Sequence, residues 1–385
     1  MNSNHSPFEP ITIGPLRLRN RFIKSGANEA MCLDGAPTRA LVQHHRELAA
    51  GGVGMTTVAY MAVAPEARTL PNQIWIRPEI LPDLQVLTSA VHDAGASISA
   101  QITHGGSFVT GMKVKGRTIS ASSGFNPAGM LKGNFLQRAM TPADMEQVIG
   151  EFVAAAQLAR DAGFDAVELH MGHGYLLNQF ISPLNNRRRD EFGGSASNRV
   201  RFPARVLRAV KEAVGDTTAV LAKINVADGT RRGASVEDGV ITARALEAAG
   251  ADMLVLSGGR NVESTWFMFG SRMNRSELSS VLKQQGEWLT AFMMKAAASS
   301  EPDIQFREMY FLEYSRKIRA ALGLPLAYLG GITSLANAEQ AVAEGFECVV
   351  LARALLHDPA LVNKFRSGER VESGCDNCNG CVAYI

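Results

Sequence analysis

The 385-residue sequence predicts a single α/β domain, residues 1–385, folded as a (β/α)8 TIM barrel, and three features support this prediction. The first is a repeated local pattern, in which a helical stretch ends at a glycine and a short apolar run follows. It occurs at seven glycines: Gly52, Gly95, Gly163, Gly215, Gly250, Gly323 and Gly345. Glycine suits the left-handed conformation after a helix, and short apolar runs suit strands buried on both faces of a parallel sheet.

The second feature is the segment "NRFIKSG", residues 20–26, which supplies one more strand with no helix before it. Eight strands alternating with helices close most simply into a barrel. The third feature is the absence of a glycine-rich phosphate loop after this strand. A doubly wound open sheet normally carries G-x-G-x-x-G there, and "KSGANEAM" does not fit that pattern.

Individual elements have recognisable boundaries. The segment 11–20 alternates around a Gly-Pro pair and predicts an N-terminal β-hairpin that plugs the bottom of the barrel. Thr141 predicts a helix N-cap, with Pro142 at the first helical position and Asp144 where a capping box places an acid. Ser235 begins a second helix on the same plan.

Two segments interrupt the barrel rhythm. Residues 260–305 form a long insertion after the sixth predicted strand, rich in aromatic and Met side chains, of which 276–299 could be helical. Loops of this length are usually functional or carry their own structure, so a lid over the active site and a helix on the outer wall are both open. Residues 371–385 form a tail with three cysteines.

Composition limits the class of protein. The chain is 46% hydrophobic and 20% charged, with a net charge of +2 and no long run of like charge. These values are typical of a globular enzyme, and the charge pattern argues against nucleic-acid or membrane binding. The N-terminal residues do not resemble a signal peptide, and five unevenly placed cysteines do not suggest a secreted disulfide framework. We therefore expect a cytoplasmic protein, which could be a homo-oligomer.

The segment "ELHMGHGYLLNQFISP" places His170, His173 and Tyr175 where the fourth strand ends. In barrels of this kind, catalytic side chains come from the carboxyl ends of the strands. Two imidazoles could bind one substrate oxygen while the phenol moves a proton. Alternatively, one histidine caps a turn and the other is exposed. We expect no metal, because no other strand end supplies a matching set of ligands.

Lys223 lies in the apolar fifth strand, where alternation puts it on the same face as Leu221 and Asn225. A lysine buried there needs an anionic partner. It could be a Schiff-base lysine of an aldolase or lyase, or a cation beside an anionic cofactor ring. Gly330, Gly331 and Arg353 end the seventh and eighth strands, where barrels often bind phosphate.

Five segments match one known family: "LRLRNRFIKS", "QITHGG", "GFDAVELHMGHGYLLNQFISPLNNRRRDEFGGSASNRVRF", "YLGGI" and "LARALLHDPALVNK". Together they resemble the old yellow enzyme family of FMN-dependent oxidoreductases, along nearly the whole chain. The spacing within the central segment is highly specific. We interpret its part from Arg187 to Arg199 mainly as structure, with salt bridges and a helix start near Ser197.

The resemblance implies FMN as cofactor and NADH or NADPH as reductant. By position, the implied flavin contacts are Ser25, Gly26, Ala27, Asn28, Ala59, Gln101 and Lys223, with Lys223 at the N1 and C2 carbonyl. The implied phosphate contacts are Gly330, Gly331, Ala352 and Arg353. His170 and His173 would bind the substrate oxygen, and Tyr175 would deliver a proton.

The implied reaction follows a ping-pong scheme, in which NAD(P)H reduces FMN and hydride then passes to the β-carbon of an α,β-unsaturated carbonyl or similar activated alkene. Two alternatives remain: a Schiff-base aldolase or lyase that uses Lys223, and a flavin-binding protein without turnover.

The sequence departs from the family pattern in three places, one of which is an insertion longer than in compact family members. Asn28 stands where many relatives have threonine or cysteine, and its neighbour Glu29 is expected near the substrate side. The tail resembles the start of the iron–sulfur motif of larger dienoyl-CoA reductase relatives. Cys375, Cys378 and Cys381 provide only three thiolates, so we expect no iron–sulfur cluster there.

Overall fold

The eight predicted strands form one closed parallel barrel in the computed structural model, which describes residues 6–284, 286–288, 290–292, 302 and 304–384. In chain order the barrel strands are β3 (Phe22–Lys24), β6 (Met55–Ala62), β7 (Ser97–Thr103), β11 (Ala166–Met171), β12 (Ala219–Asn225), β13 (Met253–Ser257), β14 (Leu326–Leu329) and β15 (Cys348–Leu351). Sequential strands are neighbours throughout, and β15 closes the barrel against β3. The predicted fold class is therefore confirmed.

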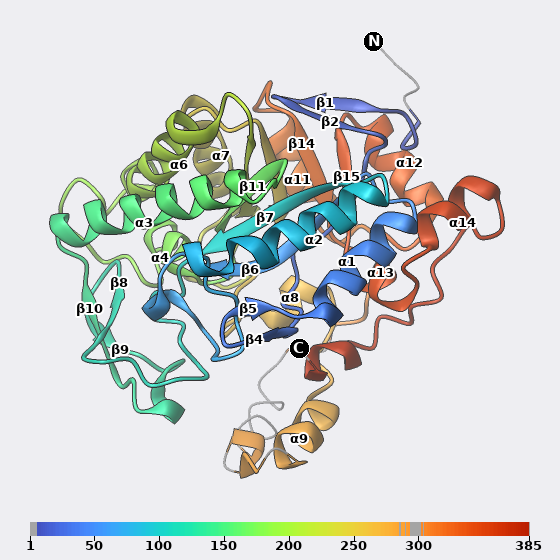
Figure 1. The fold of residues 1–385 in the computed structure, drawn as a ribbon. Coiled ribbons are helices and arrows are strands. Elements are labelled where there is room, and N and C mark those ends of the chain that lie inside the picture. The colour runs from blue at the N-terminus through green and yellow to red at the C-terminus, as the bar shows by residue number, and fades with distance from the viewer. Residues whose placement is uncertain (1–5, 285, 289, 293–301, 303, 385) are drawn as a thin grey trace.

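Helices surround the barrel (Figure 1). They include α1 (Arg39–Ala50), α2 (Leu81–Asp93), α3 (Pro142–Asp161), α6 (Arg201–Val214), α7 (Val236–Ala248), α11 (Leu312–Arg319), α12 (Leu335–Ala343) and α14 (Leu361–Ser367). Thr141 and Ser235 both form complete capping boxes, as predicted, with the carboxylates of Asp144 and Asp238. None of the helices in the described part of the chain is both long enough and apolar enough to span a bilayer.

The glycines that follow the helices mostly have positive φ. The angles are 107° at Gly52, 80° at Gly95, 88° at Gly163, 98° at Gly250 and 87° at Gly345. At Gly215 the predicted left-handed conformation is wrong, because φ is −65° and its N–H still donates to the Lys211 carbonyl in a helical bond. Gly323 has no positive φ either.

The N-terminal hairpin closes the end of the barrel where the strands begin. It pairs β1 (Ile11–Ile13) with β2 (Leu16–Leu18), and Ile13 and Leu18 are fully buried. They belong to one apolar cluster with Leu221 and Met253, whose side chains fill the lower barrel interior. The predicted plug is therefore present, and the active site must lie at the other end.

Two small sheets were not predicted. The chain after β3 forms the pair β4 (Cys32–Leu33) and β5 (Ala36–Pro37). The chain after β7 forms a three-stranded sheet of β8 (Thr118–Ser120), β9 (Gly124–Phe125) and β10 (Leu136–Ala139). Both follow a strand end, so they belong to the same end of the barrel as the predicted site.

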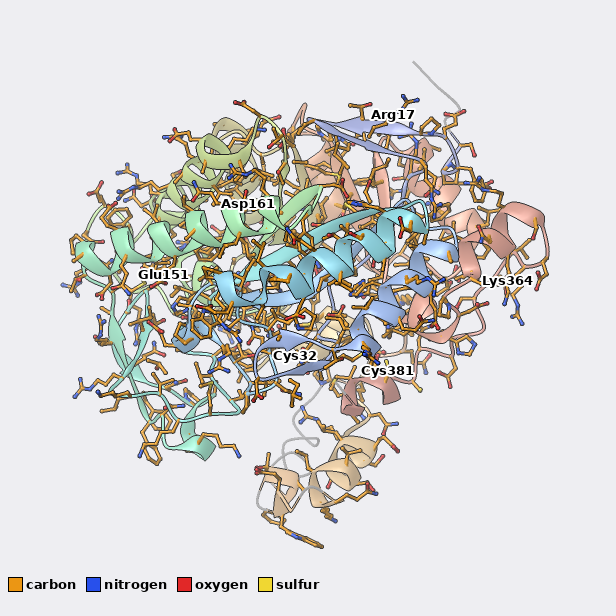
Figure 2. All side chains as sticks on the ribbon, viewed as in Figure 1. Arg17, Cys32, Glu151, Asp161, Lys364 and Cys381 are labelled. Carbon is orange, nitrogen blue, oxygen red and sulfur yellow. The ribbon has the colours of Figure 1, made fainter. Side chains whose placement is uncertain are left out.

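The insertion also follows a strand end. It contains α8 (Thr265–Phe269) and α9 (Arg275–Gln284). The predicted single helix over 276–299 is wrong, because Gly286, just beyond α9, has a φ of 81° and interrupts the helix. Residues 293–299 lie outside the described part of the chain. α9 packs against the tail element η5 (Gly380–Tyr384) and projects away from the hairpin in Figure 1. Arg17 of the hairpin and Cys381 of the tail lie toward opposite ends of the molecule (Figure 2).

Candidate active site

The register of three neighbouring strands brings four polar side chains together, three of which were predicted from the sequence. Glu168 on β11 stands opposite Gln101 on β7, and His170 stands opposite Lys223 on β12. Because alternate residues of a strand point to the same face, Glu168 and His170 both point into the barrel. Gln101, Glu168, His170 and Lys223 are all at most 3% exposed.

Lys223 has an anionic partner within the protein. Its Nζ lies 3.2 Å from Glu168 Oε1, and it donates to Ser25 Oγ at 3.3 Å and to the Gly26 carbonyl at 3.2 Å. Gln101 Nε2 donates to the same Glu168 oxygen at 2.5 Å. The sequence analysis did not single out Glu168, although its place two residues before His170 puts it on the same strand face.

The two histidines and the tyrosine form one aromatic cluster. The His170 ring lies 4.9 Å from His173 and 4.5 Å from Tyr175, measured between centroids, with edge-on geometry. His173 has φ of 59°, and its amide donates to Asn225 Oδ1 at 3.1 Å while its Nε2 lies 2.8 Å from Ser257 Oγ. The alternative in which one histidine is exposed is therefore not supported.

These imidazoles are neutral at physiological pH. Burial, with a smaller contribution from Lys223, lowers the pKa of His173 to about 3, and burial lowers the pKa of His170 well below its usual value. The amide of Gly172 donates to His170 Nδ1 at 3.3 Å, so the ring proton of this neutral imidazole is on Nε2. Neutral His170 is therefore a hydrogen-bond donor without a positive charge.

Tyr175 is packed by two further aromatic rings. Tyr60 lies 5.1 Å from it and Phe108 lies 5.6 Å from it, between centroids. Burial raises the pKa of Tyr175 well above its usual value. Its phenol therefore keeps its proton across the physiological range, which is the state needed to donate one.

The predicted flavin-lining residues of the first three strands meet at Gly26. A Cβ placed on Gly26 would lie 2.7 Å from Gln101 Nε2 and 3.1 Å from Ala59 Cβ, so no side chain fits there. Ala27 and Asn28 are half-buried beside it. Gln101 Oε1 is buried with no hydrogen-bond partner among the described residues, which leaves an acceptor for a bound group.

Glu29 does not lie where it was expected. Its side chain is 4% exposed and ion-paired with Lys24, and its Oε2 accepts the Ala59 N–H at 3.0 Å. The expected position near the substrate side is wrong, because the Glu29 carboxylate is held by the buried Lys24 cation and the Ala59 amide behind the first strand.

The predicted phosphate residues also converge. Gly330 and Gly331 have φ of 131° and 73°. In the loops and turns of the described chain, no backbone hydrogen bond uses the amide of Gly330, Gly331 or Ala352 as donor. Arg353 donates to Asn379 Oδ1 at 2.6 Å and to the Phe269 carbonyl at 2.9 Å, so the tail and the insertion both reach this residue.

These observations fit an FMN molecule. Gly26 lets the first strand pack directly against Gln101 and Ala59, and Gln101 Oε1 and Lys223 offer an acceptor and a cation to the edge of a bound ring. Free amides and the Arg353 guanidinium stand at the other end, where a phosphate requires donors and positive charge.

Burial raises the pKa of the half-buried Cys381 thiol, and the nearby thiols of Cys375 and Cys378 raise it further. Within the described ranges, no group of three His, Cys, Asp or Glu side chains is arranged to hold a metal ion. The absence of an iron–sulfur cluster stays a prediction.

Comparison with known proteins identifies the family. The sequence profile of the NADH:flavin oxidoreductase / NADH oxidase family matches residues 6–292. The chain belongs to this family. This membership confirms that the cofactor is FMN and that the reductant is a reduced nicotinamide. It also confirms the resemblance to the old yellow enzyme family. The chain is accordingly a flavin-dependent oxidoreductase, which does not support the aldolase or lyase alternative.

Among its relatives, the 4,4'-dithiodibutanoate disulfide reductase of Rhodococcus erythropolis is 40% identical over 385 residues, covering 99% of this chain and 93% of that protein. An NADPH dehydrogenase of Geobacillus sp. is 30% identical over 360 residues, covering 91% of each chain. An NADH oxidase of Thermoanaerobacter brockii is 31% identical over 380 residues, and the match spans 52% of its length.

Two solved structures show the same fold. A 2-naphthoyl-CoA reductase superposes with a TM-score of 0.80 at 23% identity, covering 98% of this chain and 54% of that one. The old yellow enzyme homologue of Zymomonas mobilis superposes with a TM-score of 0.72 at 20% identity, covering 97% and 96%.

Proposed function

We propose that this chain uses NADH or NADPH to reduce the activated double bond of an α,β-unsaturated carbonyl compound. The observation that carries the proposal is the neutral cluster of His170, His173 and Tyr175, at 4.9 and 4.5 Å between ring centroids, beside the buried Lys223. When bound, FMN would supply the hydride-transfer chemistry that links the nicotinamide to the substrate.

The protein residues bind and polarise the substrate. His170 and His173 hold the carbonyl oxygen, and their hydrogen bonds strengthen as negative charge develops on it. Because both rings are neutral, they stabilise this charge without transferring a proton to the oxygen. Tyr175 donates a proton to the carbon next to the carbonyl group, which completes the reduction.

The proposed cofactor-binding residues are those that the family resemblance implies, and the site geometry supports them. Ser25, Gly26, Ala27, Asn28, Ala59 and Gln101 line the ring, and Lys223 stabilises negative charge at its pyrimidine edge. Gly330, Gly331, Ala352 and Arg353 bind the phosphate. Lys223 donates to Ser25 Oγ and to the Gly26 carbonyl and is ion-paired with Glu168, so its amine is poorly placed to attack a carbonyl group.

We also propose that residues 1–385 form a single domain and that residues 260–305 cover its active site. Tyr310 donates to the Met268 carbonyl at 2.9 Å, which holds α8 at the end of the barrel. Lys132, beyond β9, forms an ion pair with Glu287 of the insertion at 2.6 Å. This contact joins the segment after β7 to the insertion after β13. Such an arrangement suits a lid over the site better than a helix on the outer wall.

A second candidate function is the reductive cleavage of an organic disulfide, which the 40% identical disulfide reductase supports. One sulfur would accept the hydride and the other would leave as a thiolate. The Tyr175 phenol could protonate that thiolate, yielding two thiols. Both functions use the same residues, so only the acceptor differs.

The test is an anaerobic pair of half-reactions. The purified protein is reduced with NADPH or NADH, and flavin absorbance is followed after adding a cyclic enone or a linear dicarboxylate disulfide. Reoxidation by the enone that is at least tenfold faster than by the disulfide supports the first function. The reverse order supports the second, and reoxidation by oxygen alone contradicts both.

A further inference from the structure

A second buried ion pair lies directly behind the segment 25–28. Lys24 and Glu29 have side chains that are only 1% and 4% exposed. Lys24 Nζ donates to Glu29 Oε1 and to the Thr57 carbonyl, the latter at 3.1 Å. Burying two charges is costly unless both are fully paired, and the flavin chemistry described above makes no use of either.

Strand alternation puts this pair outside the barrel. Ile23 packs in the interior cluster, so its neighbour Lys24 points outward, toward α1. His45 of α1 is fully buried there, with Nε2 3.8 Å from Glu29 Oε1 and Nδ1 2.7 Å from Thr56 Oγ1. The pair is therefore shielded from solvent by α1.

The ion pair joins the two ends of the segment 25–28 and ties both ends to β6. Lys24 precedes the segment and binds the Thr57 carbonyl, while Glu29 follows it and accepts the Ala59 N–H at 3.0 Å. From inside the barrel, Lys223 donates to Ser25 and Gly26. The segment is thus held between two buried ion pairs, one on each side of the barrel wall.

We propose that Lys24 and Glu29 are positioning residues for the flavin. They fix residues 25–28 and Ala59 in the arrangement that accepts the ring, and their opposite charges cancel close to it. Neither touches the cofactor. This inference rests on the proposed function, because it takes FMN to lie against that segment.

The test compares Glu29→Ala, Lys24→Met and the double variant Lys24→Met/Glu29→Gln. FMN affinity of each apoprotein is measured by quenching of flavin fluorescence, and the midpoint potential of each loaded protein by spectroelectrochemistry. We expect both single variants to bind FMN at least tenfold more weakly. Glu29→Ala leaves a cation and should raise the potential, whereas Lys24→Met leaves an anion and should lower it. A tenfold change in the relative affinity for reduced flavin corresponds to about 30 mV.

The chain offers a matched control at the other end of the barrel. Lys211 and Asp252 form an ion pair at 2.8 Å, and Asp252 Oδ2 accepts the Val220 N–H at 2.7 Å, so this pair has the same bonding pattern as Lys24–Glu29 but is more exposed. Lys211→Met and Asp252→Asn should lower stability but leave FMN affinity and potential unchanged.

Equal changes in FMN affinity and potential in the two sets of variants would reduce the Lys24–Glu29 pair to a purely structural role. If a single variant does not fold, the double variant decides, because it buries no unpaired charge. Affinity within twofold of wild type in the double variant would then overturn the proposal. Wild-type apoprotein that fails to bind FMN would instead contradict the proposed function itself.

Discussion

Lys223 Nζ lies 3.2 Å from Glu168 Oε1, and both side chains are almost completely buried. Each comes from a different barrel strand, and each points inward at the level of the proposed ring edge. Glu168 balances part of the Lys223 charge, so the lysine is not left unpaired when the site is empty. Lys223 can still stabilise additional negative charge on a group that binds beside it.

Glu168→Gln should therefore destabilise the apoprotein more than the FMN-bound protein. Loss of one partner of a buried pair typically costs about 3–5 kcal/mol, because the other charge stays buried. Bound flavin would partly replace the missing carboxylate. The measurement is urea unfolding of both forms. Glu313→Gln, which removes one partner of the exposed Arg316–Glu313 ion pair, is the control. Equal losses in the two forms would contradict a role for Lys223 at the ring.

Changing both His170 and His173 to Ala should leave FMN bound but slow reoxidation by the preferred acceptor. Loss of donors to a developing oxyanion typically costs on the order of 100-fold or more. Stopped-flow absorbance of the reduced protein gives the rate. His92→Ala, which removes a surface histidine paired with Asp165, is the control. An unchanged rate in the double variant would return both histidines to a structural role.

Tyr175→Phe should slow the same half-reaction and spare reduction by NADPH, because only the phenol proton is removed while the ring packing against Tyr60 and Phe108 is kept. The solvent isotope effect on reoxidation should fall in the variant if Tyr175 supplies the proton. Tyr314→Phe, on α11 and packed edge-on against Phe267, is the matched control. Slower reduction by NADPH in the Tyr175 variant would point to a packing defect.

The buried histidines should make stability depend on pH. Burial lowers the pKa of His104 to about 4 and of His173 to about 3, below the usual value near 6.5 that the unfolded chain keeps. Their contribution is thus fully present above pH 6.5 and declines as the pH falls toward 4. Each histidine adds a slope of up to about 1.4 kcal/mol per pH unit. Urea unfolding between pH 7.5 and 5 should show a shallower dependence in His173→Asn than in wild type.

Replacing residues 275–300 with a short Gly-Ser link should raise KM for bulky acceptors several-fold and leave small ones unaffected. This deletion keeps the Phe269 carbonyl and Ser271, through which the insertion and the tail hold Arg353, so FMN should be retained. Steady-state kinetics with a small and a large acceptor provide the comparison. Equal effects on both would place the segment outside the path of the substrate.

Several features could be predicted from the sequence because they depend on local periodicity. A strand keeps alternate residues on one face, so the apolar run around Lys223 predicted a buried lysine on the face of Leu221 and Asn225 that needs an anionic partner. The glycine-ended helices marked seven strands, and the hairpin and both capping boxes followed from residues adjacent in the chain. His170, His173 and Tyr175 lie within six residues of the chain, so their proximity could also be predicted from the sequence.

Contacts between distant segments were decided only by the tertiary structure. Periodicity reports which face a residue occupies, but the register between strands determines its partner. The pairing of Lys223 with Glu168 depends on how β11 and β12 align, a property of the closed barrel. Glu29 turned away from the substrate side because a buried cation and the Ala59 amide satisfy its charge better than an exposed position. Arg353 meets Asn379 only because the tail folds back across the end of the barrel.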